Sequence, residues 1–111
     1  MDLRKELDEI VKSYDLVERT VECFWANYDS YLDEEPEESH EFGFTDRNSA
    51  RAEFYGYYYG VSSNLDFEHI KVCVDGYRHG ENCRAISFWC IYRMDGELFD
   101  DHFVVEQKGL I

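Results

Sequence analysis

Residues 84–94 read Arg-Ala-Ile-Ser-Phe-Trp-Cys-Ile-Tyr-Arg-Met, and Asp95-Gly96 follows directly. In an extended chain one face of this segment carries four apolar or aromatic side chains, namely Ile86, Phe88, Cys90 and Tyr92. The opposite face carries Trp89 and Ile91, and a strand that is apolar on both faces is usually a central one. Asp-Gly is a strong signal for a tight turn. The sequence therefore predicts a central β-strand that ends in a hairpin.

Two more strands are predicted beside this one. Upstream, the apolar residues Ile70, Val72 and Val74 alternate with His69, Lys71 and Cys73. A turn over residues 78–82 separates that run from the central strand. Downstream, a last strand over about 97–107 would carry Phe99, Phe103 and Val105 on one side. Residues 67–107 thus indicate an antiparallel meander, to which another segment could add a strand.

The amino-terminal part of the chain has the pattern of helices. Residues 2–32 contain no Gly or Pro, and their apolar positions follow steps of four and three residues: Leu3, Leu7, Ile10, Tyr14, Val17, Val21, Phe24, Tyr28 and Tyr31. We expect a break near residues 13–15, because Asp15 and Glu18 have the spacing of a helix N-cap. The fold predicted for the 111 residues is α+β in a single domain, with amino-terminal helices packed on an antiparallel meander of three to five strands.

The segment between helices and strands is harder to assign. Residues 33–41 hold six acids in nine positions, and Pro36 ends any preceding helix, so 33–45 is predicted to be an acidic loop. Residues 46–62 are compatible with helix or strand. The spacing of Ala50, Phe54 and Val61 favours helix, whereas the run from Phe54 to Tyr59 is rich in strand formers and Gly56 weakens a helix.

Charge is the strongest compositional signal. The chain holds 25 acids against 11 Lys and Arg, a net charge of −14, and residues 1–55 contribute −10 of it. Such a surface repels DNA and anionic membranes, so direct nucleic-acid or membrane binding is not expected. The charge has a plain interpretation as solubility. Its alternative is complementarity to a basic protein, since carboxylates can occupy the positions that phosphates would take.

These features lead to a binding hypothesis. We expect a cytoplasmic inhibitor or decoy that meets a basic protein, such as a nuclease or another nucleic-acid-binding protein, with charge steering and aromatic anchors. The composition is similar to that of small acidic phage proteins of the anti-CRISPR or anti-restriction type, and to bacterial immunity proteins that cap basic toxins. The expected partner-binding residues are Asp33, Glu34, Glu35, Glu37, Glu38, Glu41, Tyr55, Tyr57 and Tyr59.

No set of residues names an enzyme class, a metal site or a cofactor. Cys73, His79 and Cys83 have the atom types for zinc without the spacing of a knuckle, and Cys73 and Cys90 are expected to be small core residues. Asp100 and His102 should share one face of the last strand, with Asp101 on the other. A carboxylate beside an imidazole can do acid–base chemistry, but a solvated strand end is the commoner case.

The second half of the chain resembles part of the ketosteroid-isomerase/nuclear-transport-factor-two-like superfamily. The resemblance lies in a helix with Phe54-Tyr55, then Asp66-Phe67-Glu68-His69-Ile70-Lys71-Val72, Asp75-Gly76, Ile86-Ser87-Phe88-Trp89 and the run from Gly96 to Glu106. It implies a curved sheet that wraps helices around a pocket lined by Asp100 and His102, often in a dimer. The first alternative is therefore a small-molecule pocket protein or enzyme. The second is a homodimer joined by the apolar stripe of the amino-terminal helices.

Overall fold

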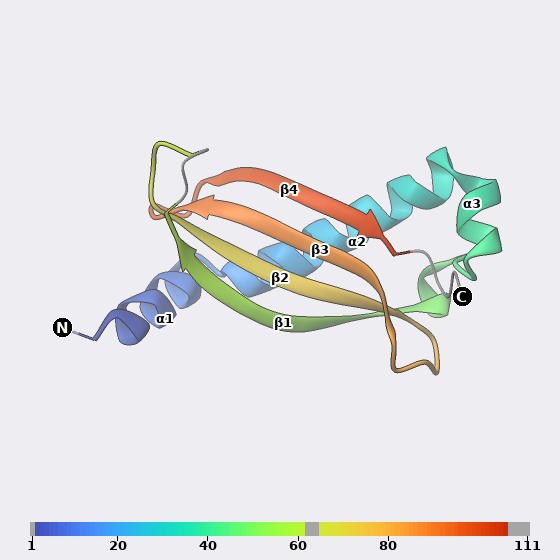
Figure 1. The fold of residues 1–111 in the computed structure, drawn as a ribbon, viewed down its shortest axis with the longest axis horizontal. Coiled ribbons are helices and arrows are strands. Elements are labelled where there is room, and N and C mark those ends of the chain that lie inside the picture. Colours follow the sequence, from blue (N-terminus) through green and yellow to red (C-terminus); the bar gives the residue numbers. More distant parts are fainter. Residues whose placement is uncertain (1, 62–64, 107–111) are drawn as a thin grey trace.

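The computed structural model describes residues 2–61 and 65–106 of the chain. Within these residues the elements follow in the order α1 Leu3–Ser13, α2 Leu16–Glu34, α3 Pro36–Glu41, the 3-10 turn η1 Arg47–Ser49, β1 Ala50–Gly60, β2 His69–Arg78, β3 Arg84–Arg93 and β4 Leu98–Val105 (Figure 1). Residues 62 and 107, at the ends of two segments predicted above, lie outside the described residues.

The strands form one antiparallel sheet in the order β1-β2-β3-β4, which confirms the predicted α+β fold and its meander. β2 and β3 are the inner strands, as expected for the doubly apolar segment at 84–94. Three irregularities interrupt the pairing, and the residues they leave without a partner are Tyr55 in β1, Ala85 in β3 and Phe99 in β4. A bulge re-aims its extra side chain and increases the local twist.

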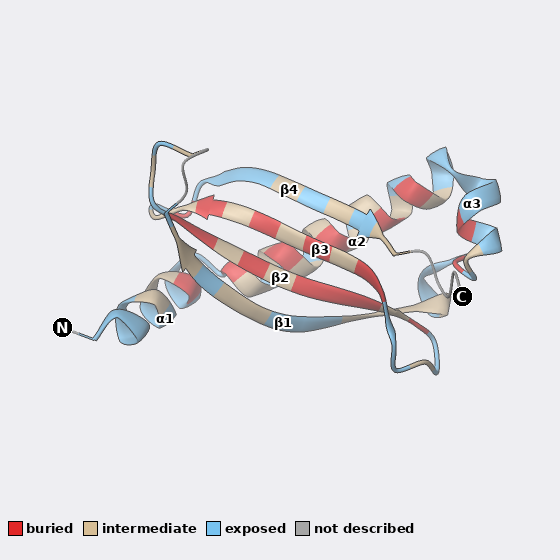
Figure 2. Ribbon diagram, viewed as in Figure 1, coloured by how far each residue is buried: buried red, intermediate tan, exposed pale blue. Residues whose placement is uncertain are grey.

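Helix α2 crosses one face of the sheet, and no helix of the described residues covers the other face (Figure 1). Its buried positions form a single stripe: Leu16, Thr20, Phe24, Tyr28 and Tyr31. These side chains meet the apolar inward residues of β2 and β3, which are among the red positions of the inner strands in Figure 2. The sheet face turned away from α2 is called the open face below.

Close contact between α2 and the sheet depends on a missing side chain. A Cβ built on Gly76 would lie 2.9 Å from a ring carbon of Phe24 and 2.8 Å from Ile86, so only glycine allows this approach. One turn before Phe24 in α2, Thr20 Oγ1 lies 2.8 Å from the hydroxyl of Tyr92 and donates to the carbonyl of Leu16 at 2.7 Å. A buried polar group needs such partners, so these bonds make Tyr92 tolerable in the core.

The helix break falls where the sequence predicted it, but its mechanism differs. Asp15 adopts a left-handed conformation with φ of 51° and makes no side-chain capping bond, so the Asp15–Glu18 spacing does not produce the predicted N-cap. The break shifts the phase of the apolar stripe. Tyr14 is therefore exposed, and Leu16 replaces Val17 as the fully buried residue at the start of α2.

Two segment assignments need correction. The predicted acidic loop at 33–45 is partly helical, because α2 continues to Glu34 and Pro36 begins α3 at a position where proline is well tolerated. Residues 50–60, which the sequence left open between helix and strand, form the edge strand β1, paired with β2 from Ala50 to Gly60. Ten residues of β1 that pair with a neighbouring strand, five on each side of the bulge at Tyr55, outweigh a helical spacing of a few apolar positions.

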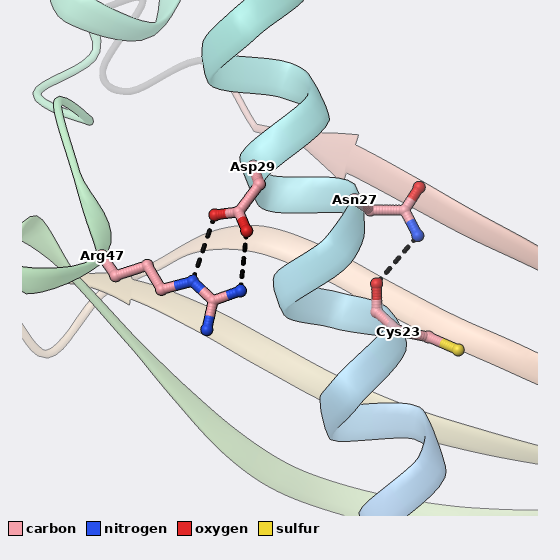
Figure 3. Close-up of polar contacts among 4 residues, drawn as sticks. All are labelled: Cys23, Asn27, Asp29 and Arg47. Atoms are coloured by element: carbon pink, nitrogen blue, oxygen red, sulfur yellow. Dashed lines mark hydrogen bonds and ion pairs between the residues drawn. The ribbon is translucent and has the colours of Figure 1, made fainter.

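A fork of charged hydrogen bonds fixes η1 on α2. Arg47 donates to Asp29 through Nε at 3.1 Å and through Nη2 at 2.6 Å (Figure 3). Two residues earlier on the same helix, Asn27 donates to the carbonyl of Cys23 at 2.9 Å (Figure 3). It also donates to the carboxylate of Asp101 in β4 at 3.1 Å. Asp101 therefore faces α2.

No helix among the described residues combines the length and the apolar character needed to cross a membrane.

Candidate functional site

The most negative part of the surface lies where α2 ends and α3 begins. Six carboxylates are exposed there, and we call them the acidic corner: Asp33, Glu34, Glu35, Glu37, Glu38 and Glu41. They belong to a stretch, residues 20–46, that holds nine acids and no Lys or Arg. Among the described residues, none of the six forms an ion pair. Their charge is therefore presented to solvent.

Local electrostatics partly oppose this arrangement. Asp33 and Glu34 sit in the last turn of α2, where the carbonyl end of the helix dipole disfavours negative charge, and that turn has no basic residue. Glu37 and Glu38 sit in the first turn of α3, where negative charge is favoured. The unfavourable electrostatic energy at the end of α2 is thus offset only in part by the favourable energy at the start of α3, since α3 is a short helix.

The neighbouring hydroxyl of Tyr31 responds to this field. Burial raises the pKa of Tyr31, and the carboxylates of Glu38 and Glu35 raise it further by disfavouring a second negative charge. Asp29, two residues before Tyr31, is the opposite case. The hydrogen bonds from Arg47 lower the pKa of Asp29, so its charge is neutralised within the fold (Figure 3). The acidic corner therefore begins beyond Asp29.

The three expected tyrosine anchors do not lie beside the acidic corner. Tyr55 is 63% exposed at the bulge of β1. Tyr57 is half-buried, stacks on Phe54 and lies near Leu7 of α1. Tyr59 donates a hydrogen bond to Glu68. β1 runs away from α3 toward the α1 end of the molecule (Figure 1). The structure thus gathers the six acids and separates them from the tyrosines.

The other candidate residues are dispersed as well. Asp100 accepts from His102 Nε2 at 3.1 Å, and His102 stacks on Trp89 with ring centroids 5.1 Å apart, so both lie on the open face opposite Asp101, as predicted. Cys90 is in the core, but Cys73 is not. It lies half-buried on the open face, because it alternates with Val72 and Val74 along β2.

The zinc-like set is also separated. His79 and Cys83 are exposed in the connection between β2 and β3, whereas Cys73 belongs to the strand. Within residues 2–61 and 65–106, no three His, Cys, Asp or Glu side chains gather in a way that could hold a metal ion.

The open face carries a pocket that the sequence did not indicate. Its volume is about 380 Å³, and it is lined by side chains from β1, β2 and β3, among them Tyr55, Tyr58, Lys71, Cys73, Asp75 and Trp89. It lies around the pair formed by Cys73 of β2 and Trp89 of β3, next to the bulge of β1. The bulge at Tyr55 and the ring of Tyr58 close one side. We call it the open-face pocket.

Asp75 is the unusual residue of this pocket. It is 7% exposed, and burial raises the pKa of its carboxyl group. Burial also raises the pKa of Cys73, so its thiol is protonated at neutral pH and is a poor nucleophile. Sequence reasoning missed both residues. The available signal was the alternation of Lys71, Cys73 and Asp75 on the polar side of β2, but nothing in it showed that this side would be hollow.

Comparison of the chain with protein-family models, with curated proteins and with solved structures found no significant match. The resemblance to the ketosteroid-isomerase-like superfamily stays a prediction, and its helix with Phe54-Tyr55 is part of strand β1 in the structure.

Proposed function

We propose that this protein is an inhibitor or decoy that binds a basic protein partner through its acidic corner. The observation that carries the proposal is the concentration of six exposed, unpaired carboxylates at the α2–α3 junction of the described chain. Charges that served solubility alone would not need to gather at one end. Nor would they favour the carbonyl end of α2, where they reduce helix stability.

The physical mechanism is charge-steered association. A cluster of like charges raises the encounter rate with an oppositely charged surface, and its effect falls as salt screens it over a Debye length of about 10 Å at 0.1 M. A surface of carboxylates also competes for the positive groove of a nucleic-acid-handling protein. The anti-CRISPR or anti-restriction type of target is the favoured one, and a basic toxin neutralised by an immunity protein is the alternative.

The test is affinity capture with two charge variants of equal net charge. One converts five residues of the acidic corner to amides: Asp33→Asn, Glu34→Gln, Glu35→Gln, Glu37→Gln and Glu38→Gln. The matched control converts five exposed acids near the other end: Glu6→Gln, Asp8→Asn, Glu9→Gln, Glu18→Gln and Glu22→Gln. Each protein is immobilised, exposed to bacterial lysate with and without phage infection, and washed at low and high salt.

We expect the wild type and the control variant to retain the same basic protein, identified by mass spectrometry, and the acidic-corner variant to lose it. Retention should weaken steeply with salt. Equal loss by both variants would show that net charge alone attracts proteins to the chain. Retention by the acidic-corner variant, or retention that ignores salt, would remove the corner as the binding surface.

A further inference from the structure

The open-face pocket has the dimensions of a ligand site. Its volume of about 380 Å³ lies within the range of roughly 300–1,000 Å³ that is common for small-molecule pockets. Among the described residues no helix covers this face of the sheet (Figure 2). The pocket is therefore open to solvent. It lies on a different face of the sheet from α2, so it is separate from the surface proposed above for a protein partner.

A buried carboxylate inside it lacks a good partner. In the described part of the chain, no hydrogen bond is donated to Asp75, and its nearest cation is Arg84, whose Nη1 lies 3.8 Å from Oδ1. Arg84 is held closer to Glu106, at 3.0 Å. Glu106 in turn accepts from Ser87 Oγ at 2.7 Å, which fixes Arg84 at the rim. A buried carboxylate is normally paired and hydrogen-bonded, because its desolvation is expensive.

The walls around Asp75 suit a positive charge. Tyr55, Tyr58 and Trp89 present aromatic rings to the pocket, and ring faces attract cations. The indole of Trp89 already holds the ammonium of Lys71, which lies 4.5 Å from its ring centroid, and the ring of His102 at 5.1 Å, so the tyrosine rings are the ones left for a ligand. The field of a chain with net charge −14 also enriches cations near its surface.

We propose that the open-face pocket binds a small organic cation, an ammonium or amidinium group on a flat apolar body, with Asp75 as the counter-ion. The cationic group donates the hydrogen bonds that the Asp75 carboxylate lacks. The apolar body lies over Cys73, against the rings of Tyr55 and Tyr58, while Lys71 stays over the ring of Trp89. Arg84 at the rim stays bound to Glu106 and leaves Asp75 free to accept from the ligand.

The probe is benzamidine, and its neutral isostere benzamide is the control compound. Binding is followed by amide chemical shifts across the full chain, which assign the site as well as the affinity. Asp75→Asn removes the counter-ion and preserves the shape of the side chain. Asp100→Asn is the matched variant, since Asp100 is an exposed carboxylate on the same face outside the pocket.

Benzamidine should shift the signals of residues 71–75 and 87–89 saturably, and benzamide at the same concentration should leave them in place. Asp75→Asn should weaken benzamidine binding at least 10-fold, and Asp100→Asn should change it less than 2-fold. Benzamidine should also slow alkylation of Cys73 relative to the exposed Cys83 of the same molecule. Equal shifts by both compounds, or full affinity in Asp75→Asn, would overturn the proposal.

These outcomes are independent of the proposed protein partner. The five-acid variant of the acidic corner keeps the open-face pocket, so it should bind benzamidine within 2-fold of the wild type. A chain that captures no basic protein and still binds benzamidine through Asp75 would retain this inference and lose the function proposed above.

Discussion

Gly96 shows how one residue connects the sheet to the helices. It forms the turn between β3 and β4 with φ of 88°, a conformation that side chains other than glycine rarely adopt. A Cβ at this position would lie 2.5 Å from the ring of Tyr14. The carbonyl of Gly96 accepts a hydrogen bond from Arg19 Nη1 at 2.8 Å. The hairpin turn therefore rests directly on the junction of α1 and α2.

Gly96→Ala is expected to destabilise the protein by about 2–4 kcal/mol. Left-handed backbone costs about 1–2 kcal/mol for a residue with a Cβ, and the clash with Tyr14 adds a further overpacking cost of roughly 1–2 kcal/mol. Gly80→Ala is the control, because Gly80 has φ of 80° and no atom within 4 Å of its Cβ position. Urea unfolding should show a loss for Gly80→Ala of only about 1–2 kcal/mol. Equal losses would mean that the Tyr14 contact is unimportant.

Asp75 should give stability a distinctive dependence on pH. Burial raises its pKa in the folded chain, so the folded state binds this proton more tightly than the unfolded state. The contribution of Asp75 to the unfolding free energy therefore falls as pH rises from about 4, the unfolded value, through its raised pKa. The charged groups that act on it are Arg84, which limits the shift, and Glu106 and Glu53, which enlarge it.

Asp75→Asn removes this dependence. We expect the variant to be at least as stable as the wild type at pH 7, with the difference shrinking toward pH 3, where the carboxyl group is neutral. Thermal unfolding across pH 3–8 measures it, and Asp100→Asn controls for the change in net charge. A variant that is less stable at pH 7 and equal at pH 3 would show that the ion pair with Arg84 outweighs the burial of the carboxylate.

At the scale of elements, the junction between α1 and α2 depends on a residue under local strain. Asp15 takes φ of 51° without a side-chain capping bond, although its carbonyl accepts the first helical bond from Arg19 N at 3.0 Å. Asp and Asn tolerate this conformation better than most residues, and Gly tolerates it best. The helix break is therefore a backbone feature more than a capping feature.

Substitutions at Asp15 should follow this order. Asp15→Gly is expected to raise the unfolding free energy by about 0.5 kcal/mol, since relief of strain exceeds the added flexibility of the unfolded chain. Asp15→Ala should lower it by about 1 kcal/mol. Asp15→Asn controls for charge and should stay within about 0.5 kcal/mol of the wild type. Denaturant unfolding measures the series, and an alanine variant as stable as the glycine variant would contradict it.

At the scale of the whole molecule, shape and charge are both asymmetric. The described chain measures 48 × 28 × 27 Å, with the acidic corner at one end and α1 at the other (Figure 1). Most of the negative charge belongs to the helical half of the chain, whereas Arg51, Lys71, Arg84 and Arg93 lie on the strands. Repulsion within the helical half is a cost to folding that salt can reduce.

Salt is therefore expected to stabilise the protein. Raising NaCl from 10 to 500 mM should increase the midpoint of thermal unfolding by about 3–8 °C, which corresponds to roughly 1 kcal/mol for a domain of this size. The five-acid variant of the acidic corner should respond less, because it carries five fewer negative charges. Calorimetry measures both midpoints, with sucrose as a non-ionic control for the wild type. A midpoint that is independent of salt would show that the acids are too far apart to repel one another.

Much of the architecture could be predicted from the sequence, because it follows from local periodicity. The doubly apolar run at 84–94 and Asp95-Gly96 determined an inner strand and its hairpin, and the stripe in residues 2–32 determined two helices with a break near 13–15. The opposite faces of Asp101 and His102 follow from the alternation of a strand. The missed assignments, β1 and α3, are segments where local preferences conflict and pairing or packing decides.

The candidate sites divide in the same way. The sequence by itself determined the acidic corner, since six acids within nine consecutive residues remain close to one another in any fold. Only the tertiary structure decided that the tyrosines of β1 lie away from it and that Cys73 leaves the core. It alone created the open-face pocket, because a pocket depends on which residues meet across strands that are distant in the sequence. The pairing register and the bulges decide which residues become neighbours, and both are properties of a pair of strands that the sequence of one strand does not reveal.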